Sequence, residues 1–355
     1  MKKILLLLVM LIAGYLLLWP VPIEPVAWQA PPAPALEGRF ATNELLGDAV
    51  SLGLNAGIGP EDVAIDAEGF LYAGYEDGRV VRFDAHGKQP ELLADTGGRP
   101  LGLDIAPNGN LIVADGYRGL LSIDRGGAVE VLATAADGIP FGFTDDVEVA
   151  GDGRIYFSDA SSKFGPAMKA RDDIMEHGGH GRLLRHDPVK GTTEVLLDGL
   201  QFANGVALSQ AEDFVLVNET GSYRITRYWL KGSRAGSHDV FFDNLPGLPD
   251  GISSNGRGTF WVALFSPRNA LLDAMSDKPF LRKAAFRLPE LLQPQPAHHG
   301  FVLGLDESGE VTHNFQATGR DAFAPITSVE QHGDTLYLCS LNEPRFARFP
   351  LQQAR

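Results

Sequence analysis

The sequence predicts an all-β fold, a six-bladed β-propeller that is preceded by a transmembrane helix and interrupted by one helical insertion. Short apolar segments recur along the chain, each followed by a glycine-containing turn and a second strand-like segment. The turn glycines Gly69, Gly109 and Gly153 stand 40 and 44 residues apart, which is the period of a four-stranded blade. Forty-one glycines and 23 prolines are spread through the chain, as expected for many short strands joined by turns.

A membrane-spanning segment is expected at residues 1–19. Lys2 and Lys3 precede an uncharged apolar run from residue 4 to residue 19. As a helix this run would be roughly 24 Å long, a little short of the ~30 Å hydrocarbon core of a bilayer. No pair of small residues follows it at the spacing of a cleavage site, so a retained signal-anchor is favoured over a cleaved signal peptide. The lysines place the N-terminus in the cytoplasm and the propeller on the non-cytoplasmic side of the membrane.

The propeller is expected to follow a spacer. Residues 20–35 are rich in proline and predict a semi-extended linker. Residues 36–355 carry six repeat units, and a pair of β-sandwiches is the distant alternative. The apolar segments of the six units begin at or near Val63, Leu103, Val147, Val206, Ile252 and Val329.

Residues 268–293 depart from the strand pattern and look helical and amphipathic. One interpretation is a helical excursion packed on the rim of the propeller. The alternative is a lid over the axial pocket or a surface that dips into the bilayer.

Composition and motifs exclude several classes of function. The net charge of −15 argues against a nucleic-acid partner, which requires a basic patch. The single Cys339 excludes an internal disulfide. The chain contains no Gly-x-Ser-x-Gly elbow, phosphate-binding loop or His-Glu-x-x-His motif, so hydrolases built on these motifs are set aside.

Four oxygen-bearing side chains stand at similar places in different units, each just before a strand-like segment. They are Glu61, Asp145, Asn204 and Asp250. Equivalent positions on different blades point at the central axis, where oxygen ligands from several directions suit Ca²⁺. Each residue alone is also a common turn former, so the prediction of a calcium site depends on the four together.

The chain resembles the strictosidine-synthase-like group of calcium-dependent six-bladed propellers, most closely the type of the adipocyte plasma membrane-associated protein. Paraoxonases and the gluconolactonase/regucalcin proteins are more distant relatives. The segments that carry the resemblance are residues 98–102, 113–120, 155–163, 181–184, 202–206 and 244–250.

The resemblance implies an axial calcium held by one Glu, two Asn and one Asp. Glu61, Asn204 and Asp250 match this set, whereas Asp145 replaces the second Asn and adds a negative charge. A deeper calcium, as in paraoxonases, would take Asp62 and Asp146. The alternative is that Asp62 is solvated and Asp146 is hydrogen-bonded within the protein.

The resemblance does not carry over a catalytic base. The histidine of the lactonases falls on Leu101, and the catalytic glutamate of strictosidine synthase falls on Thr327, so synthase activity is not expected. Asp145 or Asp146 could act as the base if it is not fully engaged with metal. Exposed loop histidines usually have no specific role, but four of them could reach the mouth of the tunnel. They are His177, His180, His298 and His299.

The predicted function is a membrane-anchored, Ca²⁺-dependent hydrolase of small, apolar esters or lactones, with the metal polarising the carbonyl. The alternative is a non-catalytic propeller that calcium stabilises and that binds a small ligand or a protein partner.

Overall fold

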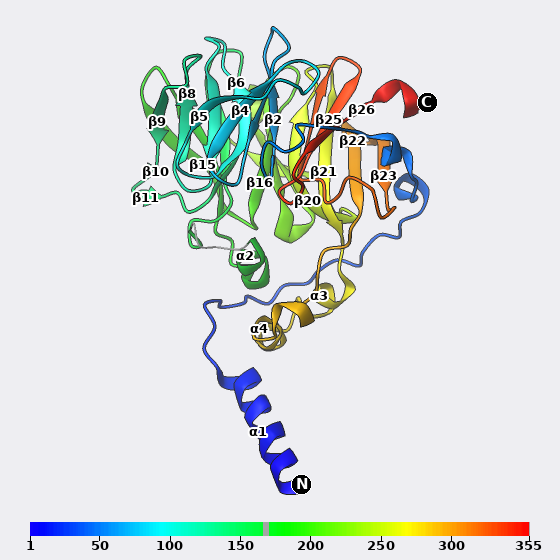
Figure 1. Cartoon of the computed structure of the whole chain (residues 1–355). Helices are drawn as coiled ribbons and strands as arrows, with labels where there is room; N and C mark the ends of the chain where they lie inside the picture. Colours follow the sequence, from blue (N-terminus) through cyan, green and yellow to red (C-terminus); the bar gives the residue numbers. More distant parts are fainter. Residues whose placement is uncertain (166–169, 355) are drawn as a thin grey trace.

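The computed structural model describes residues 1–165 and 170–354, and its strands form six four-stranded antiparallel sheets around a central axis (Figure 1). The predicted six-bladed propeller is therefore confirmed. Every repeat unit found in the sequence begins in or near the first strand of one sheet.

The strands of the first three blades are as follows. Blade one contains β2 (Val63–Ile65), β3 (Leu71–Gly74), β4 (Arg79–Phe83) and β5 (Glu91–Asp95). Blade two contains β6 (Pro100–Ile105), β7 (Leu111–Asp115), β8 (Gly119–Ile123) and β9 (Val129–Ala133). Blade three contains β12 (Thr144–Val149), β13 (Ile155–Asp159), β14 (Gly181–Asp187) and β15 (Thr192–Leu200). A small hairpin of β10 (Ala135–Ala136) and β11 (Ile139–Pro140) precedes blade three.

The remaining blades follow the same order except for the last. Blade four contains β16 (Ala203–Leu208), β17 (Phe214–Glu219), β18 (Arg224–Trp229) and β19 (His238–Phe242). Blade five contains β20 (Gly247–Ser254), β21 (Thr259–Pro267), β22 (Gly300–Asp306) and β23 (Val311–Ala317). Blade six contains β24 (Ser328–His332), β25 (Thr335–Cys339), β26 (Phe346–Pro350) and β1 (Val50–Leu52). Because β1 pairs with β26, the N-terminal part of the propeller closes the ring on its C-terminal part.

The repeated glycines end the turns between the first and second strands. Gly69, Gly109 and Gly153 have φ values of 86°, 84° and 85°. The N–H of each donates to the carbonyl three residues earlier, at 2.8–3.0 Å. A side chain is disfavoured at positive φ, which is why glycine marks every one of these turns.

Buried carboxylates join neighbouring blades around the axis. Asp62 accepts a hydrogen bond from the Leu103 N–H at 2.9 Å, so it joins blade one to blade two. Asp104 accepts a hydrogen bond from the Val149 N–H at 2.6 Å, so it joins blade two to blade three. Because sheets that radiate from an axis share no backbone ladder, such side-chain bonds connect one blade to the next.

Helices form a cap over one end of the propeller (Figure 1). It consists of α2 (Ala170–Glu176), α3 (Ala270–Ala274), α4 (Pro279–Phe286) and the 3₁₀ turn η5 (Glu290–Leu292). Three of these elements fall within the predicted helical insertion, residues 268–293. Helix α2 was not predicted from the sequence, because seven residues are too few to show helical periodicity. Other 3₁₀ turns are η1 (Gly38–Phe40), η2 (Leu45–Asp48), η3 (Thr220–Ser222), η4 (Gly232–Arg234) and η6 (Leu351–Ala354).

Residues 20–35, predicted to be a spacer, lie against the cap, and we call them the strap. Ile23 is completely buried against Met175 and Met275. The Val26 N–H donates to the Glu176 carbonyl at 2.8 Å, and the Trp28 ring stacks on His177 with centroids 4.2 Å apart. The strap therefore forms part of the packed structure and is not a free linker.

Arg282 of α4 connects the strap to the cap from a fully buried position. Its guanidinium donates to the carbonyls of Met175 at 3.0 Å, Ser276 at 2.7 Å and Val26. We expect Arg282→Met to leave these carbonyls without donors and to lower the stability of the cap by about 2–4 kcal/mol. Hydrogen exchange of the cap amides should accelerate, whereas Lys283→Met on the same helix should leave it unchanged. Equal protection in both variants would contradict this role.

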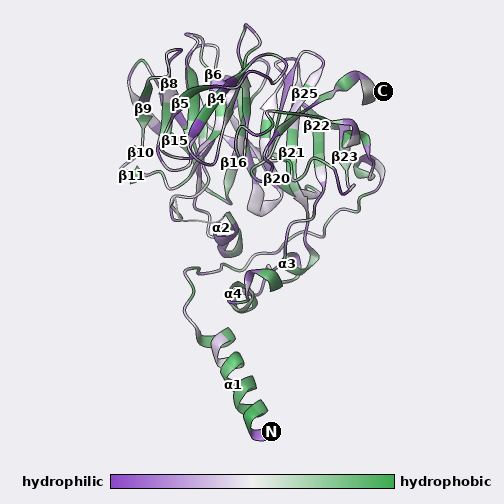
Figure 2. Cartoon of the chain, viewed as in Figure 1, coloured by the Kyte–Doolittle hydropathy of each residue, from purple (hydrophilic) through white to green (hydrophobic). Residues whose placement is uncertain are grey.

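The prediction of a membrane anchor at residues 1–19 is wrong. The N-terminal helix α1 (Lys2–Leu18) is hydrophobic along most of its length (Figure 2), but it has 17 residues and is therefore ~26 Å long. Among the helices of residues 1–165 and 170–354, none has the length and apolarity needed to cross a membrane. The predicted single-pass topology, with the propeller on the non-cytoplasmic side, depended on that anchor and is wrong for the same reason.

Candidate active site

A chamber of about 510 Å³ lies between the cap and the end of the propeller. The cap contributes apolar side chains, among them Met175, Leu272 and Phe286. The propeller contributes Asp145, Asn204 and Asp250, together with further apolar residues at its wall: Leu101, Phe143, Phe202, Leu248 and Phe265. The chamber is thus mostly apolar. Oxygen-bearing side chains lie on its propeller side, and polar side chains of the cap, among them Arg171, Glu290 and Gln293, also line it.

The site residues are directed into the chamber by irregularities in the first strands of the blades. The pairing of β12 with β13 is interrupted between Thr144 and Val147, and β6, β16 and β20 are interrupted at equivalent places. Two residues leave the ladder at each interruption. The first of these two residues lines the chamber in all four strands. These first residues are Leu101, Asp145, Asn204 and Asp250. Bulges of this kind redirect side chains next to functional sites.

The second residue of each interruption is packed tightly against the next blade. Gly102, Gly205 and Gly251 occupy three of these places, and a Cβ atom on Gly205 would lie 2.2 Å from the Ile252 nitrogen. Only Asp146 carries a side chain there. Its carboxylate accepts the N–H of Val206 in blade four at 2.7 Å.

The predicted ligands carry strongly interacting charges. Burial and the charges of Asp145 and Asp250 raise the pKa of Glu61 well above its usual range. Burial, Asp250 and Asp146 do the same to the pKa of Asp145. Burial raises the pKa of Asp250 to about 7. A hydrogen bond from the Asn204 amide, at 2.6 Å, acts in the opposite direction but does not cancel this rise. Glu61, Asp145, Asn204 and Asp250 therefore lie close enough to act on one another.

The loops that carry these residues are fixed by acids at the ends of the second strands. Asp159 accepts the N–H groups of Gly142 and Phe143 at 3.0 and 2.9 Å, just before Asp145. Arg182 in turn donates twice to Asp159, at 2.6 and 3.0 Å, and both side chains are buried. Asp159 has a sequence signal that could have identified it, because it is an acid at the end of an apolar second strand.

The proposed deeper ligands, Asp62 and Asp146, are fully hydrogen-bonded to the protein. The two oxygens of Asp62 accept from Leu103 and from the Ser328 hydroxyl, at 2.9 and 2.7 Å. Those of Asp146 accept from Val147 and Val206, at 2.8 and 2.7 Å. Both carboxylates act as links between blades in this structure, and the second calcium stays a prediction.

None of the four loop histidines lines the chamber. His177 is buried under Trp28 of the strap, and His298 is exposed. His180 bonds to Glu176 at 2.7 Å, and His299 bonds to Gln316 at 2.9 Å. The expectation that these residues reach the tunnel mouth is not met by the described structure.

The two positions matched to the bases of relatives also hold no base. Leu101 lines the chamber, and Thr327 donates its hydroxyl to the backbone carbonyl of Glu61 at 3.2 Å.

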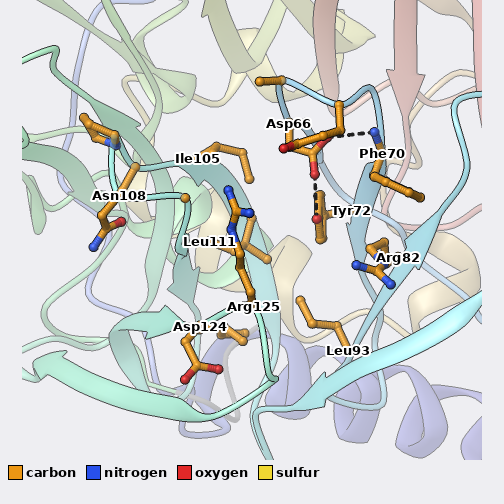
Figure 3. Close-up of a pocket in the computed structure, with 16 residues that line it drawn as sticks. Asp66, Phe70, Tyr72, Arg82, Leu93, Ile105, Asn108, Leu111, Asp124 and Arg125 are labelled. Atoms are coloured by element: carbon orange, nitrogen blue, oxygen red, sulfur yellow. Dashed lines mark hydrogen bonds between the residues drawn. The ribbon is translucent and has the colours of Figure 1, made fainter.

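A second cavity, of about 500 Å³, lies between blades one and two (Figure 3). It is lined by the turns that follow β2 and β6, at the opposite ends of these strands from Glu61. The Tyr72 hydroxyl donates to Asp66 there at 2.8 Å, and the other polar lining residues are Glu68, Arg82, Asn108, Asp124 and Arg125. None of the predicted site residues lines this cavity.

The chemistry of the axial residues suits a hard cation, although their present arrangement is not that of a formed metal site. Within the described ranges, no group of three or more His, Cys, Asp or Glu side chains is arranged to hold a metal ion. Asn204 bonds directly to Asp250, and the Oδ2 atom of Asp145 is buried without a hydrogen-bond partner. An orphaned carboxylate oxygen beside further oxygen donors is the donor chemistry that Ca²⁺ prefers.

Comparison with known proteins places the chain among propellers. The family model of strictosidine synthase matches residues 145–233, and that of the strictosidine synthase-like N-terminal region matches residues 38–83. The solved structures of a gluconolactonase from Xanthomonas campestris and of regucalcin, a calcium-binding protein from Agrobacterium tumefaciens, share the fold. The first has a TM-score of 0.62 at 20% identity and covers 94% of this chain and 99% of its own. The second has a TM-score of 0.59 at 15% identity and covers 85% and 92%.

Two curated relatives are similar over almost the whole sequence. The adipocyte plasma membrane-associated protein of Rattus norvegicus is 35% identical over 364 residues, which is 96% of each chain. The strictosidine synthase-like 6 protein of Arabidopsis thaliana is 35% identical over 325 residues, covering 90% of this chain and 84% of its own. The chain therefore belongs to the strictosidine-synthase-like family of six-bladed β-propellers.

Proposed function

We propose that the protein hydrolyses small, apolar esters or lactones in the chamber under the cap, with Ca²⁺ held by Glu61, Asp145, Asn204 and Asp250. The observation that carries the proposal is that Asp145, Asn204 and Asp250 line the propeller end of a mostly apolar cavity. The buried Glu61 is not among the lining residues, but the charges of Asp145 and Asp250 act on it. A gluconolactonase and a calcium-binding regucalcin share this fold, which agrees with the proposal.

The chamber selects and orients the substrate. Phe143, Phe202 and Phe265 on the propeller and Leu272 and Phe286 on the cap favour an apolar acyl or aryl group over a sugar. The cap covers this end of the propeller (Figure 1), and shielding from bulk water strengthens electrostatic interactions with a reacting carbonyl. Ca²⁺, when bound, would supply polarisation of that carbonyl and stabilisation of the oxyanion.

Asp145 is the best-placed proton acceptor. It lines the chamber, and its Oδ2 atom lacks a hydrogen-bond partner among the described residues. Burial raises its pKa, so the carboxylate is more basic than that of an exposed aspartate and can take a proton from the attacking water through the oxygen that does not hold the cation. Asp146, the other predicted base, has both oxygens engaged by N–H donors.

Hydrolysis assays with and without a chelator test the proposal. We expect turnover of phenyl acetate and of a medium-chain lactone that is lost in chelator and restored by Ca²⁺, with slower turnover of gluconolactone. Asn204→Ala and Asp250→Asn should lower kcat/KM by about 100-fold or more. The exposed Asp198→Ala is the matched control and should retain full activity. Hydrolysis that survives both the chelator and the Asp250 substitution would overturn the proposal.

A non-catalytic binding protein is the second candidate. It is favoured because no histidine is found among the described residues that line the chamber. Its expected result is a calcium-dependent rise in melting temperature with no hydrolysis of any of the three substrates.

A further inference from the structure

A buried arginine with no carboxylate partner lies beside the axial acids. The Arg99 side chain is 5% exposed, and its Nη2 atom donates to the backbone carbonyl of Gly59 at 3.0 Å. Its Nη1 atom is buried and has no hydrogen-bond partner, and among the described residues no ion pair includes Arg99. A buried charge of this kind is costly unless some other charge compensates for it.

Several acidic groups lie around Arg99: the proposed ligand Glu61, and also Glu76 and Asp115. The charge of Glu61 acts on the Arg99 guanidinium, and the guanidinium opposes the rise in the pKa of Asp145 that burial and Asp250 cause. The backbone also holds the arginine in place. Its N–H donates to the buried Asp115 at 2.9 Å, and its Nη2 atom holds Gly59, two residues before Glu61. Arg99 is thus fixed between the loop of blade one and that of blade two.

We propose that Arg99 is a fixed countercharge for the axial carboxylates. It balances part of their repulsion when no cation is bound, and it limits the affinity of the same site for a divalent cation. The part that concerns the cation rests on the proposed function, whereas the countercharge in the metal-free protein does not.

The net charge of the site explains both effects. Glu61, Asp145 and Asp250 together carry three negative charges when ionised, so a divalent cation alone leaves one unbalanced. The guanidinium supplies the remaining positive charge from a fixed position. Because like charges repel strongly in a poorly solvated site, removing it should favour the cation.

Calcium titration tests the first consequence. We expect Arg99→Gln to lower the Kd for Ca²⁺ by about tenfold or more, whereas Arg99→Lys, which keeps the charge, should stay within about threefold of the wild type. Arg118→Gln removes an exposed arginine from the neighbouring loop and should leave the Kd unchanged, because solvent screens its charge. An unchanged Kd in Arg99→Gln would overturn the proposal.

A double-mutant cycle in chelator tests the second consequence without any metal. Arg99→Gln should raise the unfolding equilibrium constant about tenfold more in the wild-type background than in Asp145→Asn. Arg99→Gln alone could fail to fold. Recovery of folding when Asp145→Asn is added would then support the countercharge. If neither this double variant nor Arg99→Lys folds, the proposal is overturned. Additive effects also overturn it. A wild type that binds no Ca²⁺ would refute the proposed function and leave the result of this cycle intact.

Discussion

In a chelator, the protein should lose stability as the pH is raised from about 4 to about 8. Burial raises the pKa of Asp250 and that of Asp104 from 3.8 to about 7. Between these values the native state binds more protons than the unfolded state, so the free energy of unfolding falls as the pH rises. A shift of this size amounts to about 4 kcal/mol per group as an upper limit. The loss is complete above about pH 8 and absent below about pH 4.

Urea unfolding at a series of pH values measures this effect. Asp104→Asn should flatten part of the pH profile, because the amide does not titrate, although it also weakens the bond to Val149. Adding Ca²⁺ at pH 8 should restore the stability lost by the proposed ligands, because a cation that binds only the native state stabilises it. A stability that rises between pH 4 and pH 8 in chelator would contradict the raised pKa values.

Arg182→Met should lower the free energy of unfolding by about 3–5 kcal/mol. The substitution leaves the buried Asp159 carboxylate without its cation, and an uncompensated buried charge is among the most destabilising changes known. Because Asp159 holds Gly142 and Phe143, the loop before Asp145 should also become mobile, and affinity for Ca²⁺ should fall.

Chemical denaturation of a matched pair of variants measures the effect. Arg82 pairs with Glu91 at 2.6 Å on the surface, so Arg82→Met should cost no more than about 1 kcal/mol. Replacing both members of the buried pair, with Asp159→Asn added to Arg182→Met, should recover part of the stability. Equal losses for Arg182→Met and Arg82→Met would show that burial of the pair is unimportant.

The repeat was predictable because it depends on residues that are close together in the sequence. A turn that needs positive φ selects glycine, so Gly69, Gly109 and Gly153 reveal the blade period without any knowledge of distant contacts. The same regularity identified Asp145, Asn204 and Asp250, because equivalent positions in a propeller face a common axis. Local patterns also misled at the N-terminus, where the hydrophobicity of α1 was apparent but the helix proved shorter than a membrane span.

The sequence by itself therefore determined the six blades and the acids that face the axis, since both depend on residues near each other in the chain. Only the tertiary structure decided what surrounds those acids. Arg99, just before blade two, bonds to Gly59 in the loop before blade one, two residues from Glu61. Arg282 joins α4 to α2 and to the strap through backbone carbonyls that carry no sequence signature. The chamber likewise forms from segments more than 100 residues apart, from α2 to α4, and its apolar lining depends on how they pack. Contacts between distant segments are set by packing of the whole molecule, and a local pattern does not encode them.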